Sequence, residues 1–312
     1  MRRPLHLVLG ALLGGVLAVG AAPAATSAGE SSSDNRAVKV SAATTAAAQD
    51  RVASYWTPAR MRAAKPADTG AVSASDAAPA RGTSTRIADT AAKKPPQQPT
   101  ASTSVTSTTG KVFFSMGGGN YVCSGAATSS GNRSVVTTAG HCVKDGAGAW
   151  ATNWAFVPAY NNGARPYGTW TARNLVTTSA WANRTDINYD GGFAIMNALN
   201  ARYLTDVVGG QGIAFNQARG LYYNAYGYPA APPFNGQSLK SCAGYAQDDI
   251  YGGTQSQRIP CNMTGGSSGG PWLTSGLINS VNSFGYNGVA NQMFGPYFGS
   301  AIQSAYNSAA TG

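Results

Sequence analysis

Short β-prone runs between turn-forming residues are the feature that most restricts what this chain can fold into. From Lys111 onward, brief apolar and β-branched segments recur between Gly- and Asn-rich stretches. The clearest of them are residues 112–114, 134–138, 154–157, 192–196 and 212–215. Many short strands at this spacing predict a β-sandwich or a β-barrel. A region of about 200 residues is long enough for one such domain with a real core.

Helical periodicity is scarce in the same region. Gly295-Pro296 precedes residues 297–307, in which Phe298, Ile302 and Tyr306 lie about one turn apart. We therefore predict an all-β domain with a C-terminal α-helix. Residues 139–143, directly after a strand, are compatible with a single helical turn.

The first 28 residues have the layout of a secretory signal peptide. A positive start is followed by an apolar stretch over residues 5–19 and then by small residues, with candidate cleavage points after Ala24 or Ala28. The stretch is short and interrupted by glycine, which disfavours a membrane anchor. No later segment is apolar enough to span a membrane. We expect a secreted, extracellular protein with no membrane association after signal removal.

Residues 29–110 form a low-complexity segment rich in Ala, Ser, Thr and Pro. Tyr55 and Trp56 are its only aromatic residues, so we predict that most of it is disordered. Residues 93–99 look like an extended linker. The island at residues 55–62 has two interpretations. It either docks on the domain that follows, as a pro-segment would, or is a spacer with two incidental aromatic residues.

The charge balance of residues 111–312 argues against a nucleic-acid partner. This region contains 10 Lys or Arg residues against 6 Asp residues, and the basic residues are scattered. Binding to nucleic acid requires a basic stripe or patch. We therefore expect no nucleic-acid binding.

Four cysteines in an exported chain predict two disulfides. Of the three possible pairings we favour Cys123 with Cys142 and Cys242 with Cys261, because each closes a modest loop. Zinc ligation is the competing interpretation. It lacks ligands, since the other candidate donors would be His141 and one histidine of the signal peptide. We expect neither a metal nor a cofactor.

Two motifs place a histidine and an acid where catalysis could use them. His141 ends a β-prone run and adjoins Cys142, so its ring is held rigidly and can serve as a general base. Asp190 directly precedes the apolar run at 192–196, where a carboxylate is costly unless it is hydrogen-bonded or orients a histidine. Asp186 is a rival for that role but lies in a polar stretch.

A third motif surrounds a pair of serines in Gly265-Gly266-Ser267-Ser268-Gly269-Gly270-Pro271. Glycines here allow a tight turn, expose a hydroxyl and direct N–H groups toward a developing oxyanion. The run fits G-x-S-x-G with either Ser267 or Ser268 at its centre, a pattern shared with the nucleophile elbow of α/β-hydrolases. That fold places its histidine after the serine, and no histidine follows Ser268. The order His141, Asp190, Ser268 is instead the chymotrypsin order.

Residues 138–142 and 266–271 resemble the histidine and serine motifs of chymotrypsin-like (trypsin-fold) serine proteases. The overall arrangement resembles bacterial secreted relatives of the glutamyl endopeptidases. The resemblance covers about residues 111–312, which would then be the catalytic domain, with residues 1–28 as signal peptide and 29–110 as pro-segment or linker. It implies two six-stranded antiparallel β-barrels, with the catalytic residues between them and a Cys123–Cys142 disulfide at the histidine loop.

The resemblance also implies a role for each motif residue. Ser268 would be the nucleophile, His141 the general base and then acid, and Asp190 the orienting carboxylate. Ser268 is favoured over Ser267 because Gly-Gly-Pro must follow the nucleophile directly. The oxyanion donors would be the N–H groups of Gly266 and Ser268. Substrate would bind along Ser283, Phe284 and Gly285 as an added strand and in a neutral pocket edged by Asn262, Met263, Thr264 and Phe284.

Two departures from the family pattern change what we expect. Ser267 stands where many members have the aspartate that captures a newly formed N-terminal amine, so pro-segment control should be occlusion or folding assistance. Asn262 stands where a trypsin-like enzyme has an acid, which makes strong selection for Arg or Lys doubtful. A glutamyl endopeptidase pocket needs an extra histidine, and none is present.

Together these features predict a secreted, monomeric serine endopeptidase that hydrolyses protein or peptide substrates through an acyl-enzyme. The alternative is a non-catalytic secreted binding module on the same fold. Such modules typically lose one member of the triad, whereas this chain keeps all three.

Overall fold

The computed structural model describes residues 35–67, 74, 79–93 and 104–312. The predicted signal peptide and residues 94–99 of the predicted linker lie outside the described residues. None of the helices in the described ranges is long and apolar enough to cross a membrane.

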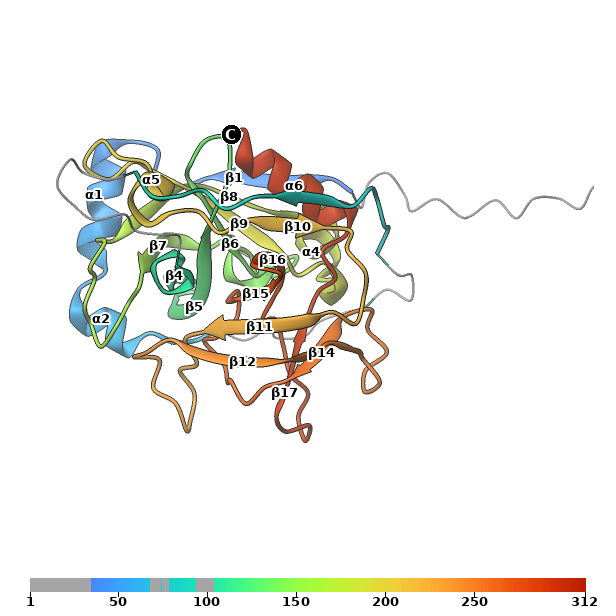
Figure 1. Cartoon of the computed structure of the whole chain (residues 1–312). Coiled ribbons are helices and arrows are strands. Elements are labelled where there is room, and N and C mark those ends of the chain that lie inside the picture. The colour runs from blue at the N-terminus through green and yellow to red at the C-terminus, as the bar shows by residue number, and fades with distance from the viewer. Residues whose placement is uncertain (1–34, 68–73, 75–78, 94–103) are drawn as a thin grey trace, which may run out of the picture. The chain divides into compact units, whose positions relative to one another are not determined.

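Six antiparallel strands close into a barrel in the first half of the domain (Figure 1). Its strands are β4 (Thr109–Met116), β5 (Gly119–Thr128), β6 (Val135–Thr138), β7 (Thr152–Pro158), β8 (Trp170–Thr178) and β9 (Gly192–Met196). Each is paired in the order β8-β7-β4-β5-β6-β9, and β9 returns to β8. The apolar runs predicted as strands are therefore strands, and the expected closed barrel is confirmed.

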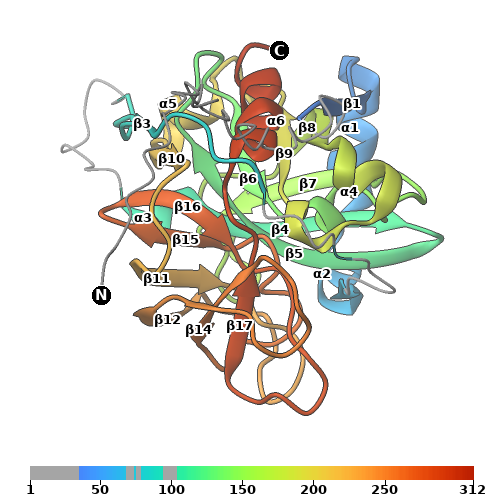
Figure 2. The same ribbon diagram turned by 90° about the vertical axis from the view of Figure 1, so that its right-hand side faces the viewer.

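The second half of the domain contains a six-stranded sheet and a three-stranded sheet (Figure 2). The larger sheet consists of β3 (Thr85–Ile87), β10 (Ile213–Phe215), β11 (Tyr222–Gly227), β12 (Lys240–Tyr245), β15 (Pro271–Thr274) and β16 (Leu277–Val281). The smaller sheet consists of β13 (Gln247–Asp248), β14 (Gln257–Pro260) and β17 (Gln292–Gly295). The Cys242–Cys261 disulfide joins β12 to the end of β14 and so links the two sheets. Among the described strands, no hydrogen-bonded pairing closes these sheets into one continuous barrel.

The C-terminal helix α6 (Ser300–Ala310) packs against both halves of the domain. The ring of Tyr306 lies 5.8 Å from Phe193 of β9 and 5.3 Å from Phe215 of β10, and Phe215 also stacks on Phe298 at 6.0 Å. The helix begins three residues later than predicted, because the carbonyl of Phe298 accepts a hydrogen bond from Asn216 in an extended connection.

The remaining helices of the domain are single turns or slightly longer. They are α3 (Val105–Thr108), α4 (Ser179–Arg184), α5 (Leu204–Val208) and the 3-10 turns η1 (Gly140–Cys142) and η2 (Ile187–Tyr189). The single helical turn expected at residues 139–143, after the second predicted strand, is η1.

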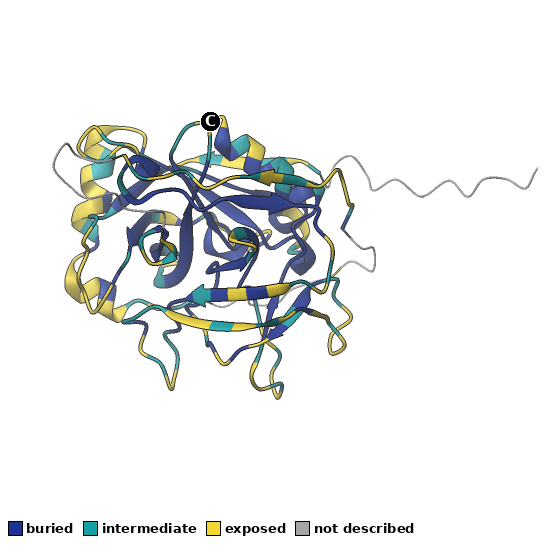
Figure 3. Cartoon of the chain, in the orientation of Figure 1, coloured by how far each residue is buried: buried dark blue, intermediate teal, exposed yellow. Residues whose placement is uncertain are grey.

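The segment before the domain is ordered wherever the structure describes it, so the prediction of a mostly disordered segment is wrong for these residues. It contains β1 (Ala37–Ser41), α1 (Ala46–Tyr55), α2 (Pro58–Ala63) and β2 (Lys65–Pro66). β1 adds to β8, β2 adds to β5 and β3 adds to β10. The outer faces of α1 and α2 remain exposed (Figure 3). The segment has little apolar surface of its own. Its few apolar side chains are buried because they pack against residues of the domain.

We predict that Phe215 carries a large share of the packing that joins α6 to the sheets. Phe215→Ala should lower the free energy of unfolding by roughly 3–5 kcal/mol, because a fully buried aromatic ring leaves a cavity. Tyr222→Ala, at a side chain that is 46% exposed, should change it by about 0.5 kcal/mol or less. Urea unfolding of both variants in a Ser268→Ala background, which prevents self-digestion, measures the difference. Equal losses in the two variants would contradict this assignment.

The buried Lys111 on β4 should make the free energy of unfolding depend on pH. Its Nζ donates to the Gly236 carbonyl at 2.9 Å, and burial lowers its pKa from 10.5 to about 8. Between those two values the unfolded chain holds the proton more tightly than the folded one, so stability contributed at this site rises as the pH rises from about 8 to 10.5. Lys111→Met should remove that rise from the unfolding free energy measured against pH. Parallel curves for the two proteins would refute the prediction.

Candidate active site

Two adjacent strands bring His141 and Asp190 together. Thr138 at the end of β6 pairs with Gly192 at the start of β9, so η1 and η2 lie side by side. His141 Nδ1 lies 2.8 Å from Asp190 Oδ2, and the His141 backbone N–H donates to Asp190 Oδ1 at 2.7 Å. The rival Asp186 serves the turn instead, because its carboxylate accepts from the Asn188 N–H at 3.1 Å.

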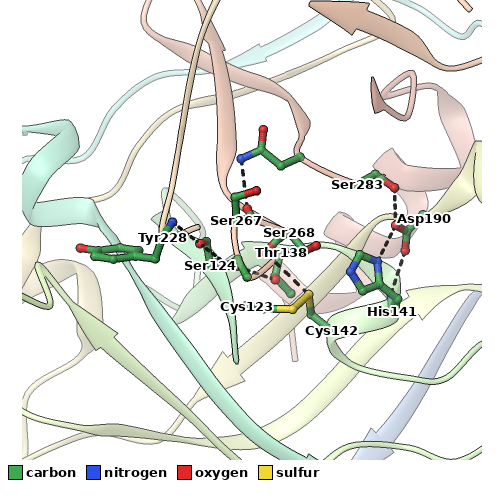
Figure 4. The surroundings of a disulfide bond; sticks show 12 residues. Cys123, Ser124, Thr138, His141, Cys142, Asp190, Tyr228, Ser267, Ser268 and Ser283 are labelled. Carbon is green, nitrogen blue, oxygen red and sulfur yellow. Dashed lines mark hydrogen bonds and ion pairs between the residues drawn. A yellow bond between two sulfur atoms is a disulfide. The ribbon is translucent and has the colours of Figure 1, made fainter. Parts of the chain in front are cut away.

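The carboxylate of Asp190 is completely buried, which requires that its oxygens be hydrogen-bonded. Besides the two contacts with His141, it accepts a hydrogen bond from Ser283 Oγ at 2.5 Å. With Nδ1 directed at Asp190, the other ring nitrogen of His141 is turned toward Ser268 (Figure 4). Within the described residues, Nε2 has no hydrogen-bond partner.

The serine loop is held against the first barrel at two points. Ser124 of β5 makes both contacts: its N–H donates to the Ser268 carbonyl at 2.7 Å, and its Oγ donates to the Gly266 carbonyl at 3.0 Å. Gly269 has φ of +80°, and a Cβ there would collide with Thr138 and Ser124. Only glycine therefore fits at the residue that follows Ser268.

The two serines of the loop have different environments. Ser267 is buried, and its hydroxyl donates to the Thr264 carbonyl at 2.8 Å. Ser268 lines the same cavity as Ser267 and is 7% exposed, but within the described residues its hydroxyl makes no such hydrogen bond. The N–H groups of Gly266 and Ser268 have no acceptor among the described residues. N–H groups without a protein acceptor are what an oxyanion-binding site requires.

The Cys123–Cys142 disulfide lies beside His141 and Ser268 (Figure 4). The predicted sequential pairing is the one found at both disulfides. Cys123, His141 and Cys142 form the one group of three potential metal ligands in the described parts of the chain. Because the two sulfurs are bonded to each other, they are not thiolates available to a metal.

A cavity of about 570 Å³ adjoins Ser268. It is lined by the predicted residues Met263, Thr264, Ser283, Phe284 and Gly285, and sequence reasoning missed two further residues of its wall, Gln292 and Met293 of β17. Asn262 is exposed and does not line it. β17 pairs with the Phe284 segment, where the rings of Phe284 and Phe294 stack at 5.0 Å.

Asn282 is a second residue that sequence reasoning missed. Its side-chain Nδ2 donates to the carbonyls of Ser267 at 3.0 Å and Tyr226 at 2.8 Å, and its Oδ1 accepts from Trp272 Nε1 at 2.7 Å. Its backbone carbonyl also accepts from the Gly269 N–H at 2.7 Å. Asn282 therefore fixes the loop on both sides of Ser268. The sequence offers little signal for this role, because Asn282 is one of several polar residues in the stretch 279–283.

Two solved structures resemble this chain over nearly their whole lengths. The protease Anisep from Arthrobacter nicotinovorans is 51% identical, with a TM-score of 0.65, and the match covers 73% of this chain and 100% of that one. The thermostable serine protease AL20 from an extremophilic microorganism is 51% identical, with a TM-score of 0.64, over 66% of this chain and 98% of that one.

The chain belongs to the chymotrypsin-like serine protease family.

A Glu endopeptidase shares the fold of this protease at 18% identity and a TM-score of 0.53, over 65% of this chain and 90% of that one. Among curated proteins, an extracellular metalloprotease of Bacillus subtilis is 35% identical over 66 residues. That match spans 21% of each protein's length. No protein-family model matches the sequence.

We predict that Asn282 sustains turnover through its hold on the serine loop. Asn282→Asp keeps an acceptor for Trp272 but replaces the donor to two carbonyls with an anion. We expect kcat for a small ester to fall roughly 10²-fold, with a smaller change in KM, because the oxyanion donors adjoin Ser267.

Asn279→Ala is the matched control for this prediction. Asn279 is also buried on β16, but it bonds Ala214 and Tyr223 rather than the serine loop. This variant should lower the free energy of unfolding and leave kcat within about twofold of the original. A similar loss of kcat in both variants would mean that Asn282 acts only through general stability.

Proposed function

We propose that this protein is a secreted serine endopeptidase in which Ser268 attacks the peptide carbonyl and forms an acyl-enzyme. The observation that carries the proposal is the arrangement of His141, with Nδ1 bound to a buried carboxylate and Nε2 unpartnered on the side of Ser268. In this geometry the imidazole can accept a proton from the serine hydroxyl. The catalytic residues are thus His141, Asp190 and Ser268.

The first half of the reaction follows from these contacts. As Ser268 Oγ bonds to the substrate carbonyl carbon, its proton passes to His141 Nε2, and Asp190 stabilises the imidazolium that results. The negative charge that develops on the carbonyl oxygen is bound by the N–H groups of Gly266 and Ser268. His141 then donates this proton to the nitrogen of the departing amine as the peptide bond breaks.

The second half repeats this sequence with water. His141 removes a proton from the water molecule that attacks the acyl-enzyme, and the proton returns to Ser268 Oγ as the ester bond breaks. No cofactor takes part in this scheme. The same chemistry serves small esters, so ester hydrolysis should accompany peptide hydrolysis.

The cavity supports a preference for an uncharged side chain before the scissile bond. Its domain walls include Met263, Phe284 and Met293, and none of its lining residues from the domain is charged. The acyl part of the substrate would lie along Ser283–Gly285 as an added strand. The leaving part would lie on the opposite side of Ser268, toward β5 and the Cys123–Cys142 disulfide.

In this proposal the protein is exported and acts outside the cell. Residues 1–28 would direct secretion, and the segment before the domain would be a pro-segment of a zymogen. Two disulfides fit an oxidising extracellular compartment.

Labelling by a serine-directed phosphonate tests the nucleophile. We expect modification of Ser268 in the original protein and in Ser267→Ala, because the Ser267 hydroxyl bonds only within its own loop. Ser268→Ala and His141→Ala should abolish labelling and lower kcat by several orders of magnitude. Labelling that disappears in Ser267→Ala but survives in Ser268→Ala would move the nucleophile by one residue. No labelling of the folded, processed protein would favour the non-catalytic alternative.

A further inference from the structure

The N-terminal segment, defined here as residues 37–67, is bound to the first barrel at three successive places. β1 adds to the edge of β8, the helix pair packs on the outer side of the barrel, and β2 adds to β5. The three contacts run continuously from the far side of the barrel to the candidate active site. The segment is therefore bound along its whole length to the first barrel. Its last contact, with β5, brings it to the candidate active site.

The helix pair is anchored by Trp56 in an aromatic groove, which we define as Phe113, Tyr160 and Tyr228 with Val122 and Val157. Trp56 is only 1% exposed, its ring centroid lies 5.5 Å from that of Phe113, and its Nε1 donates to the Asn153 carbonyl at 2.5 Å. The groove rings contact one another edge to face. Val52 and Met61 complete the packing. A buried Trp with its N–H satisfied is a strong anchor.

From this anchor the segment passes to the catalytic cavity. Lys65 and Pro66 pair with Tyr121 and Val122, and the Ala67 N–H donates to the Val122 carbonyl at 3.1 Å. Lys65, Pro66 and Ala67 all line the cavity that Ser268 lines. They therefore occupy the β5 side of Ser268, where the leaving part of a substrate would lie.

The described residues on the two sides of the cavity follow one another in the order opposite to that of a substrate. A substrate in the proposed orientation runs from the Phe284 side toward β5. The segment meets β5 first, at residues 65–67, whereas Pro79 and Arg81 line a different cavity with Asp249. Asp249 accepts a hydrogen bond from Tyr286 at 2.6 Å, and the Tyr286 ring contacts that of Phe284. The later residues thus lie on the Phe284 side.

We propose that residues 37–67 are a tethered inhibitor: the aromatic groove recognises the helix pair at Trp56 and holds Lys65–Ala67 across the leaving-group side of the cavity with reversed chain direction. This proposal rests on the proposed function of Ser268. Reversed direction explains how a peptide can fill a protease cleft without presenting a bond for attack. In that orientation the N–H and C=O groups are exchanged relative to those of a substrate.

The rate of phosphonate labelling of the full chain tests the anchor. Intact and shortened chains separate by size, so labelling of Ser268 can be followed in the intact band alone. The intact original chain should be labelled far more slowly than chain from which residues 37–67 have been removed. Trp56→Ala should raise the rate in the intact band on the order of 100-fold, because the anchor loses its burial. Asp50→Ala, on the exposed face of α1, should leave the rate unchanged.

A second pair of variants tests the contact at the cavity without touching the anchor. Ala67→Pro removes the N–H that bonds Val122, whereas Ala67→Gly keeps it. The proline variant should be labelled about tenfold faster than the glycine variant in the intact band. Equal labelling rates in the intact original chain, in Trp56→Ala and in the shortened chain would show that residues 37–67 do not inhibit the protease. That result would overturn the proposal.

Mass spectrometry of the released fragments tests the chain direction. We expect the intact molecule not to cut its own peptide bonds between Lys65 and Ala67. Cleavage of either bond at a rate independent of protein concentration would mean that the segment binds as a substrate does, and would overturn the proposal. Absence of labelling in every form, the shortened chain included, would instead overturn the proposed function and the inhibitor with it.

Discussion

The buried carboxylate of Asp190 is the charge around which the candidate active site is organised. It has no exposure to solvent, and its two oxygens are satisfied by the backbone and ring of His141 and by the hydroxyl of Ser283. Those groups come from the two halves of the domain, since His141 follows β6 and Ser283 follows β16. A single desolvated charge therefore fixes both the imidazole and Ser283, where the proposed substrate-binding edge begins. Loss of any donor would leave a carboxylate oxygen unpaired, which is costly in a buried site.

The serine loop is ordered by neutral hydrogen bonds within the domain. Ser267 bonds Thr264, Asn282 bonds the Ser267 carbonyl, and Ser124 bonds the Ser268 carbonyl. Many family members have an aspartate at the position of Ser267. In those proteins the ordering of the loop depends on the binding of a newly formed N-terminal amine to that aspartate. Here the loop has its bonds while the N-terminal segment is still attached. Ser267 and Asn282 thus help to order the serine loop in the full chain without a carboxylate at position 267.

Local patterns in the sequence were sufficient for much of this architecture. Short apolar runs between turn residues located four of the six barrel strands, β4, β6, β7 and β9, but not β5 or β8. Chain order excluded the α/β-hydrolase fold. The residues that escaped prediction depend on contacts between distant segments. Asn282 acquires its role only because β11 and the serine loop meet it. Gln292 and Met293 reach the cavity only because β17 lies beside the Phe284 segment.

The N-terminal segment failed prediction for a related reason, and its order has a consequence for the energetics of the protein. Composition reports how much apolar surface a segment owns, whereas Trp56, Val52 and Met61 are buried by surface that belongs to the barrel. The chain that folds therefore includes packing that a shortened chain would give up. Removal of the segment would expose Phe113 and Tyr160 to water while the bonds within the domain stay intact. Such a shortened protease would keep its active-site hydrogen bonds but lose this packing, so its free energy of unfolding would be lower than that of the full chain.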